Sequence, residues 1–184
     1  MPQTLEPNIH GAKRGVGRKI EVFTWQPLHL AGVYERMLSF ADRWKGTPYM
    51  AGNRVRGAGS DCAQLVPAFL DFMYRTGRET FVPRMAQDTG THNRKAAWGT
   101  VKAVRQAFPS HVVRDGTIEP GDIILTRATH DFTGPNNPGH AMIAMPRPGS
   151  ALHAMPDSGV CMTSIEVTRG ILRVYRLEGK EQWV

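Results

Sequence analysis

The hydrophobic pattern of this chain changes once, near residue 108, and this change restricts the possible folds. Before that point apolar residues recur at helical spacing, and helices are predicted at residues 30–44 and 62–74. After it, short apolar runs alternate with Gly, Pro, Asn and Asp, which is typical of strands joined by turns. We therefore predict an α+β fold in which N-terminal helices pack on an antiparallel β-sheet.

Local signals place the remaining elements. A third helix is expected at residues 94–108, and strands are expected at 121–126, 140–145, 151–154, 160–165 and 171–177. Pro67 removes one backbone hydrogen bond from the second helix, so this helix is expected to start late or to bend. The polar segment 127–139 has the length of loops that often carry function.

The chain divides into an arm and one domain. Residues 1–27 are rich in Gly, Pro and basic side chains, and we interpret them as an extended arm that is disordered or orders on a partner. Residues 28–184 are expected to form the domain. No apolar run is long enough for a membrane span, and no signal peptide is recognised. We therefore expect synthesis in a cytoplasm, with the protein staying there or leaving by another route.

The formal net charge of +7 suits an anionic partner, such as nucleic acid, an acidic wall polymer or an acidic protein surface. The basic residues are spread along the chain, apart from a small cluster between Lys13 and Lys19. No nucleic-acid-binding motif and no basic stripe interleaved with aromatic residues is present, so nucleic acid is not expected as a partner.

Cys62 has the surroundings of a nucleophile. Ser60 and Asp61 are good helix N-caps, which places the sulfur at a helix start, and the Gly-rich segment 52–59 leaves it open to a substrate. The unpaired N–H groups and partial positive charge of a helix start favour the thiolate, the nucleophilic form. Cys161 lacks such a setting and is interpreted as a small buried side chain. We therefore expect Cys62 to be alkylated much faster than Cys161 at mildly acidic pH.

A nucleophilic cysteine needs a base, and His140 is the candidate because it opens an apolar strand. His153 lies in the next expected strand. If these two strands pair as an antiparallel hairpin, the two rings become neighbours on one face of the sheet. His153 can then fix the tautomer of His140, as the third member of a catalytic triad does. A single histidine is usually a half-buried side chain, so it is the pair together with Cys62 that indicates a site.

Five motifs follow one another in order: Trp44 to Tyr49 (WKGTPY), Gly59 to Val66 (GSDCAQLV), Pro120 to Asp122 (PGD), His140, and Leu152 to Ala154 (LHA). Together they resemble the NlpC family of papain-like cell-wall peptidases. The closing segment 173–177 (RVYRL) resembles the last strand of phage tail-associated members. The resemblance covers the chain from about Leu30 to Leu177.

This resemblance implies a papain-like NlpC fold and a cysteine endopeptidase that hydrolyses peptidoglycan stem peptides, typically beside a D-glutamyl or diaminopimelyl residue. Cys62, His140 and His153 would be the catalytic residues. Tyr49 would line the site and help to hold the oxyanion, with the backbone N–H of Cys62 as the other donor. Asp61 is placed in the same pocket. The resemblance implies no cofactor and no metal.

The resemblance to tail-associated members also implies a location and partners. The protein would be made in the host cytoplasm, carried in the virion tail, and act on peptidoglycan during cell entry. Its N-terminal arm would bind phage tail-tip proteins. The chain departs from the family at Ala63-Gln64, where Ser-Gly is usual, and at Ala51-Gly52, where two glycines are usual. These departures fit a diverged phage-type branch.

Three other functions are weighed against this one. The first is a structural tail-tip or tail-assembly subunit that has the fold but little or no catalysis. The second is another thiol enzyme on the same scaffold, such as an amidase or acyltransferase. The third is a metal site, for which the ligands would be His92, His130, His140 and His153. No zinc-type spacing supports the metal site.

Overall fold

The structure is a computed structural model that describes residues 24–30, 32–74, 108–127, 138–165 and 170–183. Among the described residues, two α-helices, α1 (Val33–Trp44) and α2 (Cys62–Tyr74), precede most of the strands. The strands are β1 (Thr24–Trp25), β2 (Arg54–Val55), β3 (Gly59–Ser60), β4 (Ser110–Val112), β5 (Thr117–Ile118), β6 (Ile123–Arg127), β7 (Pro138–Ala144), β8 (Ser150–Met155), β9 (Gly159–Ser164) and β10 (Ile171–Leu177). A 3-10 helix, η3 (Lys180–Trp183), follows β10.

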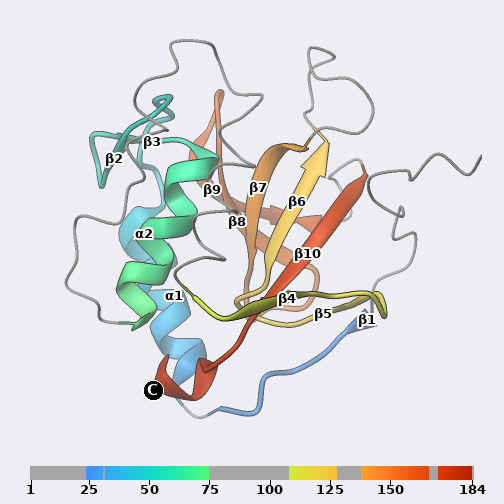
Figure 1. Cartoon of the computed structure of the whole chain (residues 1–184). Helices are drawn as coiled ribbons and strands as arrows, with labels where there is room; N and C mark the ends of the chain where they lie inside the picture. The colour runs from blue at the N-terminus through green and yellow to red at the C-terminus, as the bar shows by residue number, and fades with distance from the viewer. Residues whose placement is uncertain (1–23, 31, 75–107, 128–137, 166–169, 184) are drawn as a thin grey trace, which may run out of the picture.

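The main sheet has six strands in the order β4-β10-β6-β7-β8-β9, and each neighbouring pair is antiparallel. Helices α1 and α2 lie together on one side of this sheet (Figure 1). The predicted α+β fold with helices packed on an antiparallel sheet is therefore confirmed. Each of the five strands expected after residue 120 is present, with ends shifted by at most two residues. Of the helix expected at 94–108, residues 94–107 lie outside the described residues.

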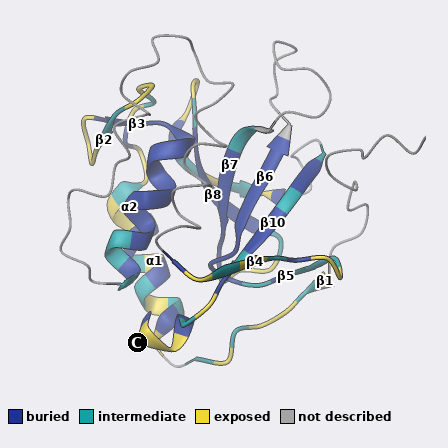
Figure 2. Cartoon of the chain, in the orientation of Figure 1, coloured by how far each residue is buried: buried dark blue, intermediate teal, exposed yellow. Residues whose placement is uncertain are grey.

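Successive side chains of a strand point to opposite faces of the sheet, and both faces are buried under apolar residues (Figure 2). Ile143 on β7 packs in a cluster between the sheet and the helices, with Phe40 and Phe69 among its members. Met142, the residue before it, packs in a second cluster on the other face. A sheet covered on both faces gives rigid strands for side chains placed at their ends.

Helix α2 begins at Cys62, as the N-cap residues predict, and continues past Pro67 to Tyr74. The late start expected from Pro67 is wrong. All residues from Cys62 to Leu70 are buried, and this packing offsets the backbone hydrogen bond that Pro67 cannot make. None of the described helices is long and apolar enough to cross a membrane.

The last residues of the predicted arm pair with the domain. The backbone N–H of Thr24 donates to the carbonyl of Gly116 at 3.1 Å, and that of Gln26 donates to Ile118 at 2.9 Å. Trp25 packs against the second hydrophobic cluster. Residues 24–26 of the predicted arm therefore pack with the domain, and residues 1–23 lie outside the described residues.

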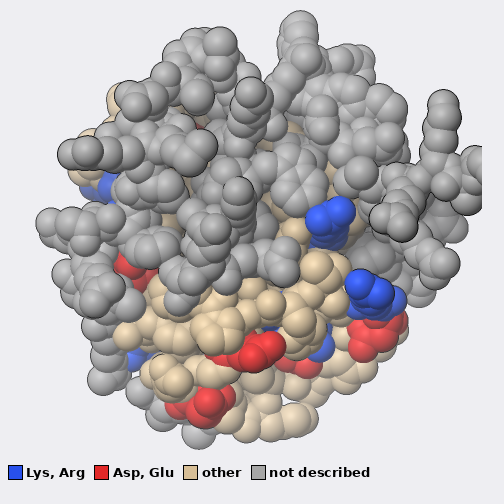
Figure 3. All heavy atoms as spheres, in the orientation of Figure 1, with Lys and Arg blue, Asp and Glu red and all other residues tan. Residues whose placement is uncertain are grey.

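The Pro-Gly-Asp motif anchors the C-terminus. The Asp122 carboxylate is fully buried and pairs with the Lys180 ammonium at 3.0 Å and the Arg176 guanidinium at 2.9 Å. Gly121 has a φ of +86°, and a Cβ there would lie 2.5 Å from the Trp183 ring. This motif therefore holds η3 against the domain. On the face drawn in Figure 3, the described residues include acidic as well as basic side chains.

Candidate active site

Asp61 joins the Gly-rich loop to the start of α2. Its Oδ1 accepts the N–H of Gln64 at 2.7 Å, which caps the helix, and its Oδ2 accepts the N–H of Gly52 at 2.6 Å. The side chain is buried, and burial raises the pKa of this carboxyl while the backbone N–H groups oppose that rise. Asp61 therefore fixes Cys62 as the first residue of the helix.

The Gly-Thr-Pro-Tyr segment ties this loop to the sheet. The carbonyl of Thr47 accepts the N–H of Val160 at 2.8 Å, and Gly46 donates to the carbonyl of Val160 at 2.8 Å. Tyr49, which is half-buried, forms a parallel bridge with Ser60, two residues before Cys62. The backbone of Tyr49 thus lies beside the segment that leads into Cys62, and its place in the oxyanion pocket stays a prediction.

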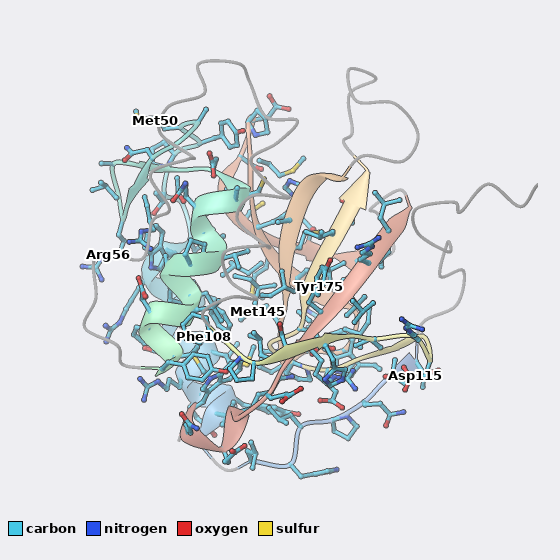
Figure 4. The ribbon with its side chains drawn as sticks, viewed as in Figure 1. Met50, Arg56, Phe108, Asp115, Met145 and Tyr175 are labelled. Carbon is cyan, nitrogen blue, oxygen red and sulfur yellow. The ribbon has the colours of Figure 1, made fainter. Side chains whose placement is uncertain are left out.

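Strands β2 and β3 surround the same end of the molecule. Figure 1 shows β3 next to the N-terminal end of α2, and Figure 4 shows Met50 at this end. Met50 is 49% exposed, although its N–H donates to the carbonyl of Ser60 at 3.0 Å. The exposed side chain of Met50 therefore lies beside the segment that leads into α2, whose first residue is Cys62.

Cys62 contacts the strand that carries His140. The pairing of β7 with β8 covers Ile143–Leu152 and Ala144–Ala151. Outside this paired part of β7, the N–H of Ala141 forms a hydrogen bond with the Cys62 sulfur. Because Ala141 directly follows His140, the sulfur lies against the part of β7 that carries the residue expected to be its base.

The two histidines are in direct contact. Nε2 of His140 lies 2.7 Å from Nδ1 of His153, and the rings meet edge to face with centroids 5.0 Å apart. Nε2 of His153 lies 2.9 Å from Oγ1 of Thr163 on β9. The antiparallel hairpin and the neighbouring rings expected from the sequence are therefore present. The catalytic roles of these side chains are predictions that the contacts support.

Burial, rather than the helix start, controls the charge of the sulfur. Desolvation and the nearby Asp61 carboxylate raise the pKa of Cys62 to about 12, and the N–H of Ala141 only partly offsets this. Burial, helped by His153, lowers the pKa of His140 to about 3, and burial lowers the pKa of His153 to about 4. At neutral pH the thiol and both imidazoles are therefore uncharged. The raised pKa of Cys62 argues against the resting thiolate expected from the helix start, whereas the faster alkylation of Cys62 than of Cys161 stays a prediction.

The other residues singled out from the sequence are the histidines of the metal alternative and Cys161. His92 and His130, named for the metal alternative, lie outside the described residues, as do residues 128–137 of the long polar loop. Cys161 is half-buried, its Sγ is 3.4 Å from the Ser158 hydroxyl, and it pairs with His153 across β8 and β9. Thr163 was missed, because a threonine in a strand carries no signal until the register is known.

The fold and the site together define a class of protein. A helix that opens on a cysteine and packs against an antiparallel sheet bearing a histidine pair is the papain-like arrangement. A solved structure of an NLP/P60-family protein shares this fold, and the chain has the NlpC/p60 papain-like fold.

Three solved structures are similar to this chain. An NLP/P60-family protein, described as similar to lipoprotein, from Staphylococcus aureus subsp. aureus Mu50 has a TM-score of 0.50 and 14% identity, with 80% of this chain and 42% of that one covered. The NlpC/p60 domain of the peptidoglycan hydrolase SagA has a TM-score of 0.44 and 20% identity, covering 75% and 96%. The P60 domain of an antigen from M. avium subspecies paratuberculosis has a TM-score of 0.45 and 16% identity, covering 78% and 93%. No family model matches the sequence, and the search of curated proteins gives no match.

Proposed function

We propose that this protein is a cysteine peptidase that hydrolyses peptidoglycan stem peptides. The observation that carries the proposal is the contact between Nε2 of His140 and Nδ1 of His153, on a strand whose Ala141 N–H binds the Cys62 sulfur. A structural cysteine needs neither contact. The ordered motifs of the sequence and the NlpC/p60 fold support a wall peptide as substrate.

The chemistry follows from the neutral resting state. Nε2 of His140 is occupied by His153, so Nδ1 is the nitrogen left to accept the proton from Cys62. As Sγ attacks the carbonyl carbon of the scissile amide, the S–H proton moves to Nδ1. The same proton then passes to the departing amine as the C–N bond breaks, and a thioester on Cys62 results. Water, with its proton taken by His140, hydrolyses the thioester and restores the thiol.

The oxyanion of the tetrahedral intermediate needs donors, and the start of α2 supplies one. The backbone N–H of Cys62, as the first residue of the helix, has no intrahelical acceptor. The Tyr49 hydroxyl is proposed as the second donor, because the backbone of Tyr49 is held against Ser60. The helix start fixes the Cys62 N–H before the substrate arrives, which is the condition for strong stabilisation of the oxyanion.

The biological setting is proposed to be the phage tail tip. The similarity of the closing segment 173–177 to tail-associated members supports it, and so does the basic cluster between Lys13 and Lys19, which suits an acidic partner surface. In this setting the enzyme would be carried in the virion tail, bind tail-tip proteins through its arm, and open the wall during cell entry.

Digestion of purified sacculi tests the proposed activity. The full chain and its Cys62→Ala variant are incubated with sacculi, and the released fragments are identified by mass spectrometry. We expect the full chain to release fragments cut within the stem peptide and the variant to release none. Equal release by both proteins, or cuts confined to the glycan strands, would contradict the proposal.

A further inference from the structure

Thr163 is a third polar side chain at the histidine pair. On the paired strands β8 and β9, His153 lies opposite Cys161 and Ala151 lies opposite Thr163. Alternate residues of a strand share a face, so Thr163 is the diagonal neighbour of His153. Its Oγ1 lies 2.9 Å from Nε2 of His153, within hydrogen-bond distance.

Both ring nitrogens of His153 are therefore engaged, Nδ1 by His140 and Nε2 by Thr163. A neutral imidazole has one N–H and one lone pair. His153 must then donate at one contact and accept at the other. The direction of the hydrogen bond at Thr163 consequently fixes the direction of the hydrogen bond at His140.

We propose that Thr163 is a positioning residue that accepts the Nε2–H of His153 and holds the pair in the tautomer that lets His140 act as base. The proposal rests on the proposed function, in which Nδ1 of His140 takes the Cys62 proton. Nδ1 of His140 must then carry no hydrogen at rest. Its Nε2–H donates to Nδ1 of His153, and the hydrogen of His153 lies on Nε2 and points to Thr163.

The opposite chain of hydrogen bonds stops the reaction. If the Thr163 hydroxyl donates, His153 is protonated on Nδ1 and donates to His140, whose hydrogen is then on Nδ1. That nitrogen has no lone pair left for the Cys62 proton. In the proposed hydrogen-bond arrangement the S–H proton moves to Nδ1 of His140, while His153 and Thr163 keep their own hydrogens. Thr163 touches no reacting atom, so its loss should lower kcat and leave KM almost unchanged.

Water is a poor substitute for Thr163, because His153 is only 3% exposed. Replacing Thr163 by the nearly isosteric valine removes the acceptor and leaves the Nε2–H of His153 without a partner. Losing one buried hydrogen bond in this way corresponds to about a ten-fold fall in rate. Serine keeps the hydroxyl and should restore the wild-type behaviour.

The test combines nitrogen NMR of the imidazoles with kinetics, on the full chain. In the wild-type protein we expect His140 and His153 both to be protonated on Nε2. In Thr163→Val we expect His153 to shift toward the Nδ1–H form and kcat to fall about ten-fold. Thr163→Ser should keep the wild-type tautomers. Thr117→Val is the matched control, because the Thr117 hydroxyl also makes hydrogen bonds, to Asp115 and Arg176, but on β5.

Three outcomes separate the possibilities. Protonation of His153 on Nδ1 in the wild-type protein overturns the proposal without any variant. A Thr163→Val protein with wild-type tautomers and the kcat of Thr117→Val also overturns it. A wild-type protein with both Nε2–H tautomers but no hydrolysis of wall peptides would contradict the proposed function while supporting the hydrogen-bond direction inferred here.

Discussion

Nε2 of His140 and Nδ1 of His153 lie 2.7 Å apart, on strands whose described pairing stops at Ile143 and Leu152. The two rings therefore bridge strands at a point where the backbones are not paired with each other. The N–H of Ala141, in the same stretch of β7, binds the Cys62 sulfur. This arrangement brings a helix start and two strands together around one sulfur.

The histidine pair should make unequal contributions to turnover. We expect His140→Ala to lower kcat by about 10³-fold or more, because the group proposed to take the Cys62 proton is lost. His153→Ala should cost less, about 10-fold to 100-fold, since it positions His140 without taking the proton. Peptide cleavage by purified variants checks both values. His111→Ala, which removes an exposed histidine paired with Glu178, is the control. Near-normal cleavage by His140→Ala would mean that another group is the base.

The reactivity of Cys62 should rise with pH far into the alkaline range. Its pKa is raised to about 12 and that of His140 is lowered to about 3, so no thiolate–imidazolium pair forms at neutral pH. In a Cys161→Ser background, we expect the rate of alkylation by iodoacetamide to increase about ten-fold per pH unit from pH 6 to beyond pH 9. A plateau already reached near pH 5 would reveal a resting ion pair and contradict this account.

Asp61→Asn should make the thiol more acidic. The Asp61 carboxylate raises the pKa of Cys62, so removing its charge lowers that pKa and increases the thiolate fraction at pH 8. We expect alkylation of Cys62 to become roughly two-fold to ten-fold faster. Asp71→Asn is the matched control, because Asp71 lies on the same helix and pairs with Arg54 at 3.0 Å. An unchanged or slower rate in Asp61→Asn would show that the charge of Asp61 does not reach the sulfur.

Gly159 should be far less tolerant of substitution than Gly149. Both have positive φ, +65° and +71°, but a Cβ at Gly159 would lie 2.3 Å from the carbonyl oxygen of Thr47, whereas a Cβ at Gly149 meets nothing within 4 Å. We expect Gly149→Ala to cost about 1 kcal/mol from its backbone conformation, and Gly159→Ala about 2 kcal/mol more. Urea unfolding measures both losses. Equal losses would mean that the contact between the Gly-Thr-Pro-Tyr segment and β9 is easily displaced.

Much of the fold could be predicted because its elements have strong local signals. Helix α2 starts where Ser60 and Asp61 predict, and β10 has the predicted ends, since Gly170 and Gly179 border an apolar run. Strands β1, β4 and β5 were missed because two or three residues cannot show a period. Pro138 was placed in a loop, but it begins β7 at a register shift, where a proline is tolerated in a sheet.

The residues of the site could be predicted from the sequence, but their protonation states could not. The residues that motif order singled out, Cys62, His140 and His153, are brought together by the fold. Their pKa values depend on burial and, for Cys62, also on the Asp61 carboxylate, and a sequence does not reveal how deeply each group is buried. Thr163 depends on the register between β8 and β9, which short strands with ordinary turns leave open.

The most direct test of the account is whether a stem peptide forms a thioester with Cys62. The full chain is mixed with a synthetic stem peptide, quenched rapidly in acid, and its intact mass and peptide map are measured. We predict an added acyl mass located on Cys62 in the wild-type protein, and neither adduct nor hydrolysis in Cys62→Ala. Hydrolysis of the same peptide by correctly folded Cys62→Ala at the wild-type rate would contradict the central claim.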